Sequence, residues 1–193
     1  LGAGVEEGDT AQLLYSTTLG TSKVLTATDI ANGYVELSWS GDLGNTSYGA
    51  FNAKMVDKAG NVSVASADAP ALLVDLSAPA APLYLDLAMA DDSGYSSTDN
   101  ITKQSGNITL TASVETGAKV EFFNDINNDG LMGAGESLGL ASVLGTTATL
   151  DNLNLGEGVY RIKALQTDAA GNVSAVSTAL DTVVDLSLIH ISE

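Results

Sequence analysis

Between residues 84 and 185, short apolar stretches alternate with runs of glycine, asparagine, aspartate and serine, which favour turns. Inside the stretches apolar and polar residues alternate, as in strands with one buried face. Seven such strands in about 100 residues predict a β-sandwich. The predicted strands are residues 84–88, 107–114, 119–124, 137–144, 147–153, 159–168 and 179–185, and the predicted inward positions are Ile108, Leu110, Ala112, Val120, Phe122, Tyr160, Ile162 and Ala164.

The first part of the chain, 1–76, shows a shorter version of the same pattern. Between two strands, residues 27–33 predict a single helical turn that ends at Gly33. The initial strands of the second half have no counterpart here, so we expect a partial domain. The predicted strands are residues 12–16, 34–40, 50–57 and 71–75.

A long repeat connects the two halves. Asp-Lys-Ala-Gly-Asn-Val-Ser at 57–63 recurs as Asp-Ala-Ala-Gly-Asn-Val-Ser at 168–174, and Val-Asp-Leu-Ser at 74–77 recurs at 184–187. The spacing along the chain between the two copies of each motif is too long for a solenoid repeat. It corresponds to one small domain of roughly 100 residues. We therefore predict all-β tandem domains: a partial sandwich at 1–76, a Pro-containing linker at 77–82 and a complete sandwich at 83–186.

The end of the chain, 187–193, breaks this repeat and resembles the in-frame translation of a sequencing adapter. We expect a non-native tail and exclude it from the fold. The only histidine, His190, lies in this tail. Because the chain starts in mid-pattern at Leu1, we expect a fragment whose export signal lies elsewhere.

Charge and composition narrow the functional classes. The chain has 24 acidic and 7 basic residues and a net charge of −17, which disfavours nucleic acid and anionic membranes and favours cations. There is no cysteine, and with the histidine in the tail neither a Ser-His-Asp triad nor a Cys-His pair can be assembled, so we expect no enzyme. No apolar run is long enough for direct membrane insertion.

The strongest chemical signal is the twelve-residue segment 125–136, between two predicted strands. It places oxygen side chains at positions 1, 3, 5 and 12 and glycine at position 6, which is the spacing of an EF-hand calcium loop. An Asn/Asp/Gly-rich hairpin turn is the alternative, because these residues favour turns. The predicted calcium ligands are Asp125, Asn127, Asp129, the backbone carbonyl of Leu131, and Glu136.

A second acidic cluster lies in the loop after the first strand of the complete sandwich. Successive loops of a sandwich alternate between its two ends, so acidic groups of neighbouring domains are expected to face each other at each junction. Like charges held that close repel unless a cation lies between them. Junction calcium and simple solvated acids both remain open. The candidate residues are Asp75, Asp91, Asp92, Asp99, Asp168 and Asp185.

Three motifs together resemble a known family: Asp-x-Ala-Gly-Asn-Val-Ser, Val-Asp-Leu-Ser-Ala-Pro-Ala-Ala-Pro, and Ala-Asp-Asp-Ser-Gly-Tyr-Ser-Ser-Thr-Asp-Asn-Ile-Thr. The combination resembles the bacterial immunoglobulin-like repeats of very large, calcium-dependent surface adhesins. The resemblance implies an extender module, calcium at domain junctions, type I secretion, and a role in cell adhesion or biofilm formation. The first half departs from it, because it lacks both the Asp-Asp-Ser-Gly loop and the twelve-residue loop.

We therefore expect a structural stalk segment of an extracellular bacterial surface protein, with neighbouring immunoglobulin-like repeats of the same chain as its partners and calcium as its cofactor. The alternative is a module that binds carbohydrate or protein, or an accessory domain of a secreted hydrolase. An exposed aromatic patch would favour binding. The only tryptophan, Trp39, is expected in the core or on a strand face.

Overall fold

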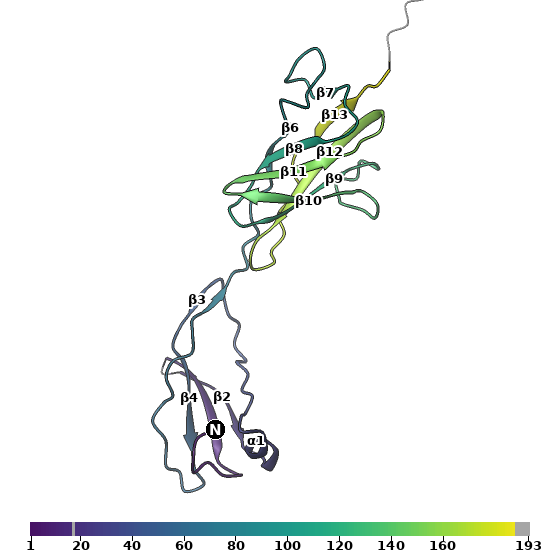
Figure 1. Cartoon of the computed structure of the whole chain (residues 1–193). Coiled ribbons are helices and arrows are strands. Elements are labelled where there is room, and N and C mark those ends of the chain that lie inside the picture. Colours follow the sequence, from purple (N-terminus) through teal and green to yellow (C-terminus); the bar gives the residue numbers. More distant parts are fainter. Residues whose placement is uncertain (17, 188–193) are drawn as a thin grey trace, which may run out of the picture. The chain divides into compact units, whose positions relative to one another are not determined.

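The computed structural model describes residues 1–16 and 18–187. The chain divides into two compact units, Leu1–Leu76 (unit 1) and the part from Ser77 onward (unit 2) (Figure 1). The adapter-like residues from 188 on, His190 included, lie outside the described residues. Within the described part, no helix is long and apolar enough to cross a membrane.

Unit 2 is a β-sandwich of eight strands in the order β6-β8-β11-β10-β9-β12-β13-β7 (Figure 1). The first half of β10 pairs with β9 and its second half with β11, so β10 passes from one layer to the other. All neighbours are antiparallel except β13 and β7. The strands are β6 (Leu83–Leu87), β7 (Ile101–Thr102), β8 (Ile108–Ser113), β9 (Lys119–Asn124), β10 (Ser137–Leu144), β11 (Thr147–Leu153), β12 (Gly158–Thr167) and β13 (Leu180–Val184).

The alternating pattern fills the space between the layers. Seven of the eight predicted inward residues are buried, and they pack with Leu87, Ala148 and Val184 in one hydrophobic cluster. The eighth, Tyr160, is half-buried against this cluster and donates its hydroxyl proton to the carbonyl oxygen of Gly156 at 2.9 Å. The predicted β-sandwich and its core are therefore confirmed.

All seven predicted strands of unit 2 are present, and their ends differ from the prediction by at most one residue. The two-residue strand β7 was not predicted. It lies inside the acidic loop and is too short to show alternation. Its position depends on parallel pairing with β13, the last strand of the unit, which a local pattern does not reveal.

Unit 1 contains a three-stranded sheet in the order β2-β1-β4 and a two-stranded sheet of β3 and β5. Helix α1 (Ala27–Asn32) confirms the predicted helical turn. Thr26 and Asp29 form a capping box at its start, and Gly33, with φ of 75°, caps its end. The strands are β1 (Thr10–Tyr15), β2 (Thr18–Val24), β3 (Thr46–Tyr48), β4 (Phe51–Val56) and β5 (Leu72–Val74).

The predicted strand at 34–40 is wrong, and the edge strand β2 was not predicted. Val35, Leu37 and Trp39 alternate and are half-buried, but the segment has irregular backbone and no ladder of backbone hydrogen bonds. Strand β2, Thr-Leu-Gly-Thr-Ser-Lys-Val, has glycine and mainly polar residues, so its propensity gave no signal. Pairing with β1 outweighs local preference in β2, whereas residues 34–40 alternate without a strand to pair with.

Candidate functional site

The twelve-residue loop joins β9 to β10, as predicted, and its two ends are anchored at the base of this hairpin. The Asn124 amide donates to the Glu136 carbonyl oxygen at 2.8 Å, and the Asp125 amide donates to the Arg161 carbonyl oxygen of β12 at 2.9 Å. Asp125 is 2% exposed and Glu136 is 6% exposed. The first and last predicted ligands are therefore buried carboxylates fixed by the sheet.

The loop's oxygen atoms accept hydrogen bonds from its own backbone amides. Asp125 accepts from Gly130 at 3.2 Å, and Asn127 Oδ1 accepts from Asp129 at 3.0 Å. The two oxygens of Glu136 accept from Ile126 and Gly133, at 3.0 and 2.6 Å. At position 6, Gly130 has φ of 78°, which favours glycine. The same hydrogen bonds are also compatible with the alternative, a hairpin turn rich in Asn, Asp and Gly.

A positive charge lies directly beside the first predicted ligand. The Lys163 ammonium, from β12, is 2.8 Å from Asp125 Oδ2, and the two side chains are only 13% and 0% exposed. The hydrogen bond from Lys163 has the largest effect on the pKa of Asp125 and lowers it. Burial raises this pKa and the Gly130 amide lowers it, so the pKa is lowered on balance. This lysine was not singled out from the sequence, because it lies on a different strand, far along the chain from its partner.

The donor set fits a hard cation. Carboxylate, amide and carbonyl oxygens are the ligands that calcium takes in proteins. The Lys163 ammonium neutralises the carboxylate at position 1 of the loop. As the side chains stand, no group of three or more Asp, Glu, His or Cys residues is placed to hold a metal ion within residues 1–16 and 18–187. Side-chain rearrangement in the loop would therefore have to accompany metal binding.

The second acidic cluster is partly buried. Asp91 accepts from the Thr109 amide at 2.8 Å and from the Gln104 side chain at 3.0 Å. Asp92 is 4% exposed, and its Oδ2 accepts from the Asn100 amide at 3.1 Å. Its Oδ1 is buried and has no hydrogen-bond partner in the described part of the chain. An unpaired buried carboxylate oxygen is costly, so this atom is suited to a cation.

Strand β7 links this cluster to the end of unit 2. The Thr102 carbonyl oxygen accepts from the Asp185 amide at 2.8 Å, and Thr102 Oγ1 lies 3.0 Å from Ser93 Oγ. The Asp185 carboxylate accepts from the amide and hydroxyl of Ser187, which lowers its pKa. Asp99 is exposed and accepts from the Ile101 amide. Asp185 therefore directly follows β13, the strand that pairs with β7 of the acidic loop.

Asp168 lies elsewhere, in the turn after β12, where its carboxylate closes its own turn. It accepts from the amides of Ala170 and Asn172 and from the Asn172 side chain, at 2.8 to 2.9 Å. These bonds, with the Asn172 side chain contributing most, lower the pKa of Asp168. Asp57 makes the same three bonds in unit 1. Asp75, half-buried, follows β5 of unit 1.

Paired serines after this turn were missed. Ser174 Oγ accepts from the Gln166 amide at 3.0 Å, and Ser177 Oγ accepts from the Ala164 amide at 2.9 Å. Their counterparts in the first copy of the repeat, Ser63 and Ser66, accept in the same way from Met55 and Ala53. The signal was available, because the two serines follow the aspartate at the same spacing in both copies.

Gln166 fastens the start of unit 2. Its side chain is 1% exposed, its Nε2 donates to the Ala80 carbonyl oxygen at 2.6 Å, and its Oε1 accepts from the Glu115 amide at 2.9 Å. Pro79 and Pro82 are also buried. The second part of the predicted linker 77–82 is therefore held against unit 2.

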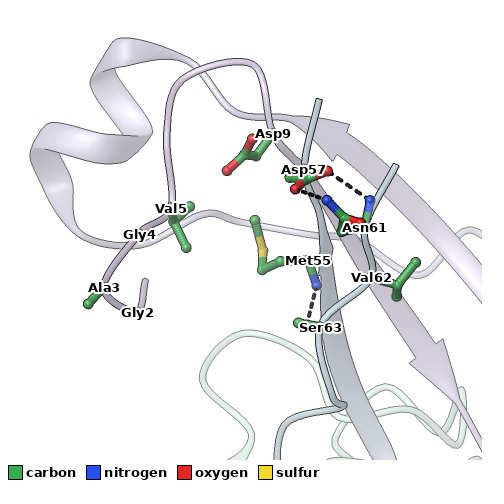
Figure 2. A pocket seen from close by; sticks show the side chains of 10 residues that line it. All are labelled: Gly2, Ala3, Gly4, Val5, Asp9, Met55, Asp57, Asn61, Val62 and Ser63. Carbon is green, nitrogen blue, oxygen red and sulfur yellow. Dashed lines mark hydrogen bonds between the residues drawn. The ribbon is translucent and has the colours of Figure 1, made fainter. Parts of the chain in front are cut away.

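In unit 1 the position of Gln166 is taken by Met55, which lines an open pocket of about 430 Å³ (Figure 2). Figure 2 shows residues 2–5 opposite the Asp57–Asn61 turn, with Met55 between them. The Asp9 carboxylate accepts from the Glu6 amide, and the Asp57 carboxylate accepts from Asn61, so both acids are used structurally. The pocket lacks a convergent set of chemical groups and carries no site.

Aromatic residues gather elsewhere in unit 1. The Trp39 ring is 6.0 Å from Tyr15 and 5.7 Å from Phe51, in edge-on contacts. Tyr15 also contacts Tyr48 at 5.6 Å. All four are half-buried and pack on one another, which is the arrangement of a small core rather than of a flat binding platform.

The fold of unit 2 defines a class of immunoglobulin-like β-sandwich modules. Residues 79–186, more than half of the chain, match the family described as bacterial Ig-like domain, and the chain belongs to this family. A structure of the fibronectin(III)-like modules of Clostridium thermocellum CbhA is similar, with 19% identity, a TM-score of 0.48, and coverage of 100% of this chain and 87% of that chain. No curated protein sequence matches the chain.

Proposed function

We propose that this chain is an extender segment of a bacterial surface adhesin: a row of Ig-like units whose role is to span distance outside the cell. The observation that carries the proposal is the recurrence of one hydrogen-bonded turn, with its paired serines, in two successive units. Tandem copies of a module without a catalytic constellation suit a spacer. Adhesion and biofilm formation would then depend on domains outside this segment.

Calcium is the proposed cofactor of unit 2. Asp125, Asn127, Asp129, the Leu131 carbonyl oxygen and Glu136 would hold it. When bound, the ion would supply a fixed double positive charge that ties the loop's oxygens together.

A second cation is proposed at the acidic end of unit 2. The unpaired Asp92 Oδ1 supports it, together with Asp91, Asp99 and the nearby Asp185. At a junction with a following repeat, such an ion would neutralise carboxylates that otherwise repel. Asp75, which precedes the linker 77–82, and Asp168, in the turn after β12, are the other proposed contributors. The partners are thus neighbouring repeats of the same chain.

The loop is tested by calorimetric titration of calcium into the chelator-treated chain. Binding at extracellular levels is expected, with a dissociation constant on the order of 10⁻⁴ to 10⁻³ M or tighter. Glu136→Gln should remove the binding and the calcium-induced rise in melting temperature. Glu157→Gln, which changes an exposed glutamate outside both clusters, is the matched control. An unchanged isotherm in Glu136→Gln would remove this site from the proposal.

The extender role is tested by small-angle scattering of three tandem copies of residues 77–187, a unit with its own closed core. Millimolar calcium should lengthen the particle and sharpen its maximum dimension relative to chelator, because bridged junctions hold neighbouring units in line. The variant with Asp91 and Asp92 changed to Asn should lose this difference. Identical scattering with and without calcium would contradict calcium stiffening.

A further inference from the structure

The Lys163 ammonium occupies a position that the proposed calcium function leaves unexplained. It lies 2.8 Å from Asp125 Oδ2, and it is 13% exposed although lysine is rarely buried. The ammonium is also close to the loop's turn, because a Cβ built on Gly130 would be 3.5 Å from Lys163 Nζ. One positive charge is therefore already placed at the first and sixth positions of the loop.

Unit 1 supplies an internal comparison for this lysine. Lys163 pairs with Phe123 across β12 and β9, and its counterpart in the first copy of the repeat, Asn52, pairs with Leu14 across β4 and β1. In unit 1, β1 is followed almost directly by β2, so there is no loop to neutralise. Asn52 instead donates to Asp68 at 2.9 Å. The buried ammonium and the acidic loop occur together.

We infer that Lys163 is an internal counter-ion that holds the loop in the metal-free protein and weakens calcium binding there. The inference rests on the proposed calcium function of residues 125–136. Asp125 is buried, and a buried carboxylate without a partner is strongly destabilising. The ammonium removes this cost when no metal is present. A calcium ion at Asp125 would meet the ammonium as a like charge, so the lysine must move away or oppose binding.

Two opposite effects follow from removing the charge. Without Lys163 the metal-free protein should be less stable, because Asp125 loses its partner. The same change should tighten calcium binding, because the competing charge is gone, on the order of 10-fold or more for a coupling of ordinary size. A lysine that only packs against the sheet would lower stability without raising calcium affinity.

The test compares Lys163→Met with the matched control Lys119→Met in the full chain. Lys119 is an exposed lysine on β9, so its loss changes the net charge equally. In chelator, Lys163→Met should melt about 5 °C or more below wild type, and Lys119→Met should melt close to wild type. In calcium titrations Lys163→Met should bind on the order of 10-fold tighter than wild type, and Lys119→Met should not.

Lys163→Gln keeps a hydrogen-bond donor without the charge and covers the case in which the methionine variant fails to fold in chelator. It should also bind calcium more tightly than wild type. Equal affinity in wild type and both Lys163 variants would overturn the inference while leaving the calcium function intact. Absence of binding in all of them would overturn both. Binding in the Lys163 variants alone would support the inference in its strongest form, with wild-type lysine excluding the ion.

Discussion

The two units share one local segment, a strand followed by the Asp-x-Ala-Gly-Asn turn and the paired serines, which we call the arm. They differ in almost everything that packs against it. In both, a strand leads into the Asp-x-Ala-Gly-Asn turn, and paired serines fasten the returning segment to that strand. In unit 2 this arm lies over a closed core, whereas the hydrophobic residues that unit 1 buries, within its described part, are Ala11 and Leu25. The repeated motif therefore specifies a local arm, and the core depends on residues that the repeat does not contain.

Equivalent strand positions make this difference measurable. Phe122 pairs with Ala164 in unit 2, and Leu13 pairs with Ala53 in the same register in unit 1. Phe122 is fully buried, but Leu13 is half-buried. Because Trp39 is the only tryptophan, its fluorescence follows unit 1, and unit 2 can be followed by the ring environment of its own aromatic residues.

The largest expected effect is on the unit 2 core. Phe122→Ala should lower the free energy of unfolding of unit 2 by about 3–5 kcal/mol, because it leaves a cavity between closed layers. Leu13→Ala should cost unit 1 only about 1 kcal/mol, because the removed side chain is already partly in water. Denaturant unfolding monitored by fluorescence and by near-ultraviolet circular dichroism measures both. Equal losses would mean that unit 1 has a closed core as well.

A smaller effect is expected at the paired serines. Ser174→Ala should cost about 1–2 kcal/mol, because the amide of the buried Gln166 loses its acceptor away from water. Ser63→Ala removes the same bond at an exposed position, where water can replace it, and should cost less than about 0.5 kcal/mol. Hydrogen exchange of the Gln166 and Met55 amides reports each bond directly. Similar costs in the two units would contradict the difference in burial.

The smallest effect on stability is expected when acid protonates the carboxylates that accept hydrogen bonds in turns and at the helix cap. Lys23, then the Thr26 amide, lowers the pKa of Asp29 from 3.8 to about 2, and Asn61 and Asn172 lower the pKa of Asp57 and Asp168. Their stabilisation is present above the ordinary aspartate pKa and is lost as the pH falls through the lowered values. Carboxyl carbon NMR should show both Asp57 and Asp168 titrating below 3.8. A midpoint at or above 3.8 for either residue would contradict the hydrogen bonds that close its turn.

The sequence was sufficient to locate strands where the local pattern and the tertiary packing agree. Strands β9, β10 and β11 were located to the residue, because each is an apolar-rich stretch bounded by turn-forming residues. It failed at residues 34–40, where alternation is present but no neighbouring strand pairs with it, and at β2, whose polar residues are paired by β1. Both errors come from contacts that a local window does not contain.

The candidate site shows the same division. The spacing within residues 125–136 indicated the donor atoms, because all of them lie in one short loop. Lys163 could not be identified, because only the register between β9 and β12 brings it to Asp125. The burial of Asp92 was likewise hidden, since the sequence does not show how its loop folds back to bring the Asn100 amide to the Asp92 carboxylate. Charge was readable from the sequence, but the partners of each charge were not.

The anchoring of Ala80 by Gln166 also determines how unit 2 carries tension. A pull on the two ends of the unit enters near Ala80 and leaves at Asp185, whose amide is bonded to Thr102. Both points are fastened to fully buried residues, Gln166 on the interior strand β12 and Thr102 on the edge strand β7. The applied load is therefore passed to buried residues at both ends, and shielded hydrogen bonds must break before either end can peel away.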